Sequence, residues 1–154
     1  MSMHAPVCFL LPVGDSAEKI GELLKENMDC VIDPAVSGSV CYLESFDWRL
    51  HQKGLQLLQK NGTELELQEK KSGRVKSSTR VKGAIKWPTD LPQGELRNSL
   101  SEILEMRALM PVVCVDTQSS MLHLRDADQK TVVRIRVDQN ECHAPGVRGK
   151  YSLV

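Results

Sequence analysis

Two arginines on one predicted strand are the first candidates for chemistry in this sequence. Residues 131–138 read TVVRIRVD, so the two-residue period of a strand places Arg134, Arg136 and Asp138 on one face and aliphatic side chains on the other. Fixed cations of this kind can bind an anionic ligand. A strand with one solvated face shows the same alternation, and the sequence leaves both interpretations open.

Further charged residues lie in the middle of the chain. Lys60 ends one predicted strand, and Glu64 and Glu66 alternate with leucines on the next. We interpret the two carboxylates as a water-facing edge, because two carboxylates without further oxygen ligands make a poor metal site. The polar segment 70–86 is typical of a solvated basic loop or short polar strands, and alternatively contacts phosphates or an acidic partner. Its seven cations are Lys70, Lys71, Arg74, Lys76, Arg80, Lys82 and Lys86.

Length and composition exclude several classes of protein. The chain has 154 residues, which predicts a single domain over residues 1–154 that can bury a core. Its formal net charge is zero, so no overall field attracts nucleic acid or an acidic membrane. Only two residues each of Trp, Tyr and Phe are present, which argues against platforms that stack bases. No apolar run reaches the length of a membrane span, so we expect neither nucleic acid nor membrane as a partner.

The cysteines and the N-terminus bear on the compartment. Five cysteines are scattered along the chain, an odd number without a Cys-x-x-Cys pair. This spacing favours buried or free thiols in a reducing cytosol over a disulfide framework or a zinc site. The N-terminus has no basic stretch before an apolar one, as a secretory signal would have. The sequence therefore predicts a cytoplasmic protein.

The apolar pattern predicts strands in two groups, each with one helix. Residues 7–11 form an apolar run before Pro12, which we interpret as a buried strand. Asn61-Gly62 between two apolar-patterned runs predicts a hairpin. Together these features predict an α+β protein with a mainly antiparallel sheet. We expect helices at 17–28, capped at Asp15, and at 95–108, and strands at 37–44, 55–60, 63–69, 112–117, 121–125, 131–138 and 147–154.

Residues 42–54 carry a recognisable pattern. They read YLESFDWRLHQKG, with an aromatic strand end, Glu44, the spacing Asp47-x-x-Leu50 and Gly54. This pattern resembles the strand-turn-strand signature of the CYTH superfamily, the triphosphate tunnel enzymes. The resemblance implies a full or partial tunnel of about eight antiparallel strands with two flanking helices. In active members, inward lysines and arginines bind a triphosphate, and inward glutamates hold magnesium or manganese.

Several positions that would carry this chemistry hold other residue types. The family's Glu-x-Glu-x-Lys on the first strand falls on His4, Pro6 and Cys8 of this chain. Of the Leu-Arg-x-Arg that follows the signature, only Lys60 remains as a cation. A proline and a thiol cannot replace a carboxylate and an ammonium group. The resemblance is therefore to a degenerate member, of the type found next to CHAD domains, that is not an enzyme and needs no cofactor.

The resemblance also implies what such a chain binds. Lys60, Arg134 and Arg136 would hold polyphosphate, a phosphorylated small molecule or another polyanion, or the chain would serve as a structural or interaction domain. The alternative is a divalent-metal-dependent triphosphatase with rearranged ligands, with Asp138 as the candidate ligand of Mg or Mn. Expected protein partners are a second copy across an open sheet edge or a CHAD-type domain.

Overall fold

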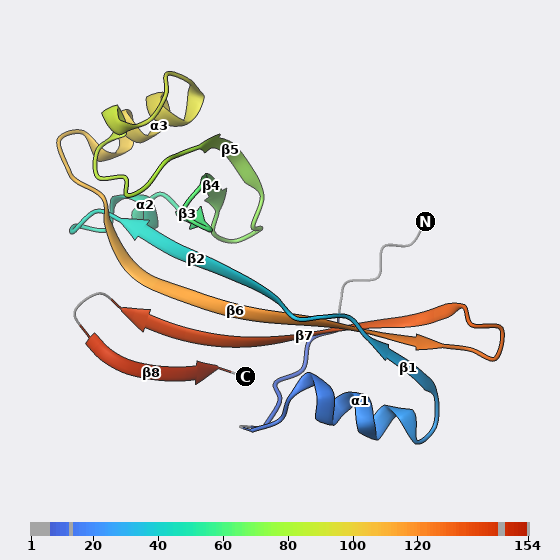
Figure 1. The fold of residues 1–154 in the computed structure, drawn as a ribbon. Helices are drawn as coiled ribbons and strands as arrows, with labels where there is room; N and C mark the ends of the chain where they lie inside the picture. Colours follow the sequence, from blue (N-terminus) through green and yellow to red (C-terminus); the bar gives the residue numbers. More distant parts are fainter. Residues whose placement is uncertain (1–6, 13, 145–146, 154) are drawn as a thin grey trace. The chain divides into compact units, whose positions relative to one another are not determined.

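A computed structural model describes residues 7–12, 14–144 and 147–153. Those residues form an α+β fold with a mainly antiparallel sheet, as predicted (Figure 1). The elements are α1 (Ala17–Lys25), β1 (Asp29–Ile32), β2 (Val36–Glu44), α2 (Arg49–Gln52), β3 (Leu55–Lys60), β4 (Glu64–Glu69), β5 (Val75–Arg80), the 3-10 helix η1 (Pro88–Asp90), α3 (Glu95–Leu104), β6 (Met110–Arg125), β7 (Thr131–Ala144) and β8 (Val147–Leu153).

The strand order is linear. Hydrogen-bonded neighbours follow the order β5-β4-β3-β2-β6-β7-β8, and β1 pairs with β6. A closed barrel requires that the first and last strands of this order pair with each other. In the described part of the chain β5 and β8 do not pair, so the sheet is open. The expectation of a full tunnel is not supported.

Contacts divide the chain into two compact units. The first contains α1, β1 and residues 118–140, and the second contains residues 37–117 and 141–151. The long strands β6 and β7 contribute residues to both units. The expectation of one domain over residues 1–154 stays a prediction.

Helix α1 covers the small core of the first unit. The helix begins after Ser16, whose hydroxyl accepts the backbone N–H of Lys19, so the cap is Ser16 and not the expected Asp15. Gly21 allows a close approach, because a Cβ atom there would lie 2.5 Å from the Cδ1 atom of Ile32 on β1. The residues that build this core are Ala17, Cys30, Leu122, Leu124 and Val137, with Leu11, Ile20, Leu24, Ile32 and Ile135 packed against it.

The N-terminal segment differs from the prediction. Residues 7–11 form no strand, and Phe9 and Leu10 are 82% and 88% exposed. Of this run only Leu11 packs on the core of the first unit, because α1 and the strands β1, β6 and β7 already fill it. Cys8 is exposed, and the expected positions His4 and Pro6 lie outside the described residues.

The second unit contains an antiparallel meander from β2 to β5. The predicted hairpin between β3 and β4 is confirmed: Lys60 pairs with Glu64 across a loop of three residues, in which Asn61 and Gly62 have positive φ angles of 51° and 68° and Thr63 donates its backbone N–H to the carbonyl oxygen of Lys60 at 3.1 Å. Leucines on one face of β3 and β4 share a core with leucines of α3. They are Leu57, Leu65 and Leu67 of these strands and Leu96, Leu100 and Leu104 of the helix, and the same core also contains Leu43, Leu50, Leu91 and Leu109.

Two strand predictions are corrected. Residues 112–117 and 121–125 are parts of one strand, β6, because the polar link Gln118-Ser119-Ser120 contains neither Gly nor Pro and continues the alternation of burial. The short strand β1 was not predicted, and the helix expected at 17–28 ends at Lys25, four residues before this strand begins. It pairs with the last four residues of β6.

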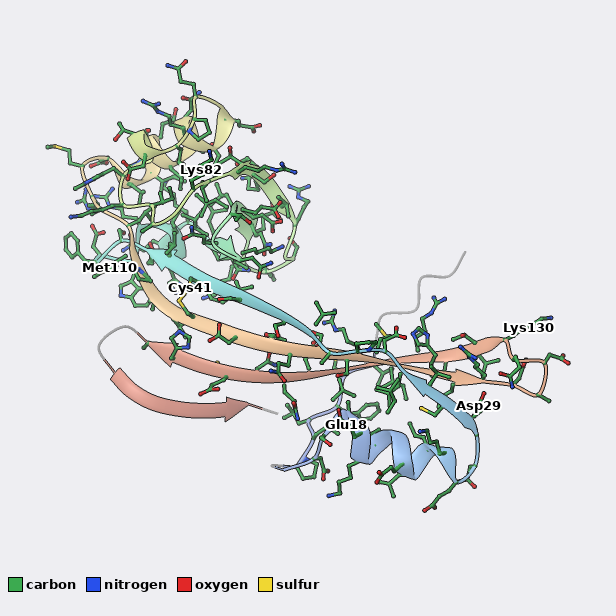
Figure 2. The ribbon with its side chains drawn as sticks, in the orientation of Figure 1. Glu18, Asp29, Cys41, Lys82, Met110 and Lys130 are labelled. Atoms are coloured by element: carbon green, nitrogen blue, oxygen red, sulfur yellow. A yellow bond between two sulfur atoms is a disulfide. The ribbon has the colours of Figure 1, made fainter. Side chains whose placement is uncertain are left out.

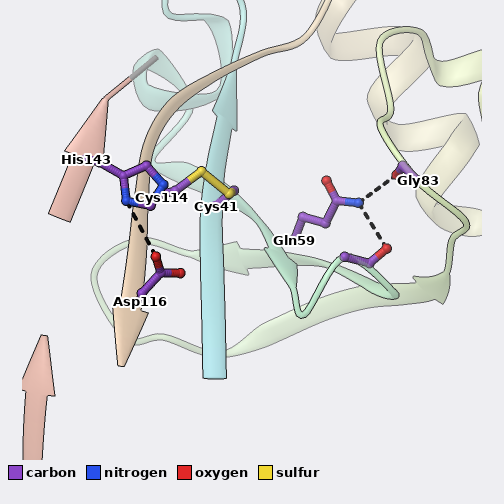
Figure 3. The surroundings of a disulfide bond; sticks show 7 residues. Cys41, Gln59, Gly83, Cys114, Asp116 and His143 are labelled. Atoms are coloured by element: carbon purple, nitrogen blue, oxygen red, sulfur yellow. Dashed lines mark hydrogen bonds and ion pairs between the residues drawn. A yellow bond between two sulfur atoms is a disulfide. The ribbon is translucent and has the colours of Figure 1, made fainter. Parts of the chain in front are cut away.

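A disulfide joins Cys41 of β2 to Cys114 of β6 (Figure 3). The expectation of free thiols is wrong for this pair, because the sheet brings together two cysteines 73 residues apart in sequence, which spacing alone cannot reveal. Cys8, Cys30 and Cys142 are free. The cytoplasmic location, which was inferred from free thiols, stays a prediction. Among the described residues, no helix combines the length and apolar character that a membrane span needs.

We predict that loss of the disulfide destabilises the second unit. Replacing Cys41 and Cys114 by Ser should lower its free energy of unfolding by about 4 kcal/mol, because the bond closes a long loop in the unfolded chain. Urea unfolding followed by tryptophan fluorescence reports on this unit, since Trp48 and Trp87 both belong to it. The control Cys142→Ser removes a free thiol and should leave the unfolding midpoint nearly unchanged. Equal midpoints for all three proteins would contradict the prediction.

Candidate functional site

The turn after β2 is built around a buried carboxylate. Glu44 is 6% exposed, and its Oε1 atom accepts the backbone N–H groups of Ser45 and Leu50 at 2.8 and 3.0 Å. Its Oε2 atom accepts the backbone N–H of His51 at 2.9 Å. Leu50 and His51 lie at the start of the short helix α2, where backbone N–H groups have no helical partner. Glu44 therefore acts as the cap of α2, and both of its oxygens are used.

Asp47 is the centre of a charged cluster on the same turn. It accepts the hydroxyl of Ser45 at 2.9 Å and the guanidinium groups of Arg49 and Arg107. Burial alone would raise the pKa of Asp47, but these hydrogen bonds outweigh it and lower the pKa from 3.8 to about 2. Glu105 joins the cluster by ion pairs of 3.1 Å with Arg49 and 3.2 Å with Arg107. The cluster thus ties the turn after β2 to the segment before β6.

The residues behind the CYTH resemblance therefore stabilise a turn. Leu50 is fully buried in the core of the second unit, and Trp48, just before α2, has a positive φ of 58°. The sequence did not point to Glu105 and Arg107, because they follow α3 without any spacing that relates them to Asp47. Only the folded chain brings them together.

Lys60, a predicted ligand-binding residue, is paired inside the protein. Its Nζ atom lies 2.8 Å from Oε2 of Glu66, and the side chain of Gln68 donates to the same oxygen at 2.7 Å. Glu66 is only 8% exposed, so its interpretation as a water-facing residue is wrong. The hydrogen bond from Lys60 lowers the pKa of Glu66, against the effect of burial and with the help of Gln68. Lys60 thus neutralises a buried carboxylate.

The basic segment 70–86 contains the edge strand β5, which fits the alternative of a short polar strand. No residue of β5 is buried, and the segment contains neither Asp nor Glu. Of its seven cations, Arg74 alone makes an ion pair with a described residue, to Glu69 at 2.8 Å. Lys70 contacts Nδ1 of His51 at 2.7 Å, and Lys86 lies over the ring of Trp87. We call Lys76, Arg80 and Lys82 the basic edge; all three are exposed.

A hollow lies beside the basic edge. Arg80 and Lys82 contribute cations to its wall, and Glu64 and Asp90 contribute carboxylates. Asp90 accepts the backbone N–H groups of Trp87 and Lys86 at 2.8 and 3.0 Å, and these bonds lower its pKa. The Asp90 carboxylate therefore caps η1. Lys82, on the wall of the hollow, follows β5 and is labelled in Figure 2. The remaining lining residues are Thr63, Val81 and Pro92.

The other predicted ligand residues belong to the first unit. Arg134 and Arg136 are exposed on β7, while Val137 packs in the core of that unit. Arg136 makes an ion pair of 3.0 Å with Asp138, which also accepts the hydroxyl of Ser119 at 2.7 Å. Lys60 belongs to the second unit. Their role in binding a ligand stays a prediction.

The candidate metal ligands do not form a cluster. In the described part of the chain, no group of three or more His, Cys, Asp or Glu side chains is placed to hold a metal ion. Asp138, the predicted ligand, is engaged by Arg136 and Ser119, and Glu44 by backbone N–H groups. Glu66 is engaged by Lys60.

Comparison with protein-family models and with curated proteins finds no match for this chain. The similarity to the CYTH superfamily stays a hypothesis that depends on residues 42–54. The geometry adds that Glu44 and Asp47, two residues of this pattern, have a structural role in the turn.

We predict that Lys60 and Glu66 are energetically coupled. A double-mutant cycle of Lys60→Met and Glu66→Gln should give a coupling of about 1–2 kcal/mol, because either single change leaves a poorly hydrated partner. Urea unfolding of the four proteins measures it. A control cycle combines Lys53→Met with Glu66→Gln and should give no coupling, because Lys53 is exposed at the end of α2. Additive effects of Lys60→Met and Glu66→Gln would contradict the pairing.

The charged turn should lose its effect on stability in acid. The pKa of Asp47 lies below its ordinary value, so its ion pairs stabilise the fold above pH 3.8 and are lost as the pH falls through about 2. The difference in free energy of unfolding between the natural protein and Asp47→Asn should therefore shrink over this range. Arg107→Gln removes one donor and should move the loss to higher pH. A difference that does not vary with pH would contradict this assignment.

Proposed function

We propose that this chain is a non-catalytic module that binds polyanions at the basic edge, with inorganic polyphosphate as the simplest ligand. The observation that carries the proposal is a segment, 70–86, with seven cations and no carboxylate of its own. Lys76, Arg80 and Lys82 are exposed there and have no ion-pair partner among the described residues. They are therefore free to contact a ligand without first breaking an internal pair.

The geometry of a strand suits a chain-like ligand. Lys76 and Arg80 are four residues apart on an extended backbone, which corresponds to about 13 Å. A flexible chain of phosphates can contact both cations and Lys82 at once, whereas a single phosphate contacts fewer. Because exposed charges are screened by salt, such binding should weaken as ionic strength rises. Long polyphosphate should therefore bind more tightly than tripolyphosphate.

The other predicted ligand residues have smaller roles in this proposal. Lys60 is committed to Glu66, so its charge is largely compensated. Arg134 and Arg136 offer a separate exposed surface on the first unit, where Asp138 offsets one of the two charges. Service as a structural or interaction domain remains compatible with the proposal. A second copy or a CHAD-type domain as partner stays a prediction.

We predict that removal of the basic edge abolishes most of the binding. The triple change Lys76→Gln, Arg80→Gln and Lys82→Gln should weaken affinity for long-chain polyphosphate on the order of tenfold or more, because three charge-assisted contacts are lost. Isothermal titration calorimetry at two salt concentrations measures the affinity. The control changes three exposed lysines elsewhere to Gln and removes the same net charge; they are Lys25, Lys53 and Lys130.

Two outcomes would contradict the proposed function. Equal losses in the triple variant and its control would mean that overall charge, and not the basic edge, attracts polyphosphate. Phosphate release from tripolyphosphate in the presence of magnesium or manganese, lost in Asp138→Ala, would show that the chain is a metal-dependent triphosphatase.

A further inference from the structure

Strand β5 leaves one side of its backbone open. It is the last strand in the sheet order and pairs with β4 only. Its residues are exposed or half-buried, and no described strand lies in register on its outer side. An edge strand of six residues with unpaired backbone groups is a template for another strand.

The register shows which groups face outward. Val81, just after β5, donates its backbone N–H to the carbonyl oxygen of Thr63 at 2.8 Å. Hydrogen-bonding residues alternate along an antiparallel pair, so Thr79, opposite Leu65, also faces β4 with its backbone groups. The backbone N–H and C=O groups of Ser78 and Arg80 therefore point away from the sheet. They are available to an added strand.

The charges decide what kind of strand fits. A second copy of β5 would place its own Lys76 and Arg80 beside those of the first, and like charges on neighbouring strands repel. A strand with carboxylates at alternate positions would instead place opposite charges next to Arg80. Lysines on an edge also have a simpler role, because they protect it from unwanted pairing. If the cations serve to bind a partner, an acidic strand binds to this edge. If they only protect the edge from pairing, it does not.

We propose that the β5 edge binds an extended acidic peptide of a partner protein as an additional strand. This inference rests on the proposed function, since the same basic edge supplies the charge. The peptide would exchange backbone hydrogen bonds with Ser78 and Arg80, and its carboxylates would lie beside Arg80, with Lys76 and Lys82 at either end. Its alternate side chains would lie beside the half-buried Ser77 and Thr79, where small or β-branched residues fit. Polyphosphate has no N–H donors, so it cannot pair with the outward carbonyl groups of β5 as an added strand would.

The test compares three peptides that carry the same charge. The probe is a fluorescein-labelled peptide that alternates glutamate with valine over about the length of β5. Two further peptides have the same sequence, one with its valine backbone amides N-methylated and the other with its glutamate backbone amides N-methylated. Fluorescence anisotropy against the full chain measures the affinity of all three. Strand addition requires that methylation of the amides facing β5 weakens binding on the order of tenfold, because backbone hydrogen bonds are lost while every carboxylate remains.

A variant of the protein tests the same backbone hydrogen bonds by changing β5 instead of the peptide. Ser78→Pro removes an N–H that faces away from β4, and proline is tolerated at such positions of edge strands. It should weaken binding of the unmethylated peptide to a similar extent and affect polyphosphate binding much less, because no cation is removed. If circular dichroism shows that this variant has lost its fold, the methylated peptides decide the matter alone.

The outcomes separate this inference from the proposed function. Equal affinities of the methylated and unmethylated peptides, with polyphosphate still bound, would overturn strand addition and leave polyanion binding standing. Protection of the edge would then be the remaining role of Lys76 and Arg80 in the sheet. Failure of both polyphosphate and the peptide to bind would overturn the proposed function as well.

Discussion

The two-faced sheet under α3 is the constraint on which the second unit depends. Leu57, Leu65 and Leu67 share one face of β3 and β4 and bury themselves against the helix. Because side chains alternate along a strand, the residues between these leucines must lie on the opposite face. That face consequently receives Lys60 and Glu66, and the charged character of the unit follows from where its leucines pack.

The buried carboxylate on the polar face determines which cations of the sheet are already paired and which are available to a ligand. Glu66 is too deeply placed to be solvated freely, so it needs Lys60 close by. Because Lys60 is paired with Glu66, the unpaired positive charge lies on β5. Arg80 there is opposite Glu64 in the sheet but makes no ion pair with a described carboxylate. The exposed cations of strands β2 to β5 that make no ion pair with a described residue, Lys76 and Arg80, therefore lie at the edge of the sheet, where we propose that anions bind.

Local patterns in the sequence predicted the local structure well. Asn61-Gly62 gave the β3–β4 hairpin, and the helical spacing of Leu96, Leu100 and Leu104 gave α3 to within four residues of its end. The features that were missed are those formed between distant segments, such as the disulfide and the pairing of Asp47 with Arg107. Spacing along the chain carries no information about such contacts, and an apolar run such as residues 7–11 cannot show whether a core has room for it.

Contacts between distant segments explain what the pattern at residues 42–54 does in this fold. The disulfide joins β2 to β6, and the Asp47 cluster joins the turn after β2 to the segment before β6, so two separate contacts link these parts of the second unit. Glu44 and Asp47 both stabilise this turn through their hydrogen bonds. A fold does not by itself determine a function, which depends on the groups at a site. The pattern at residues 42–54 therefore describes how the second unit is built, and the proposed binding of polyanions rests on the basic edge, which lies outside this pattern.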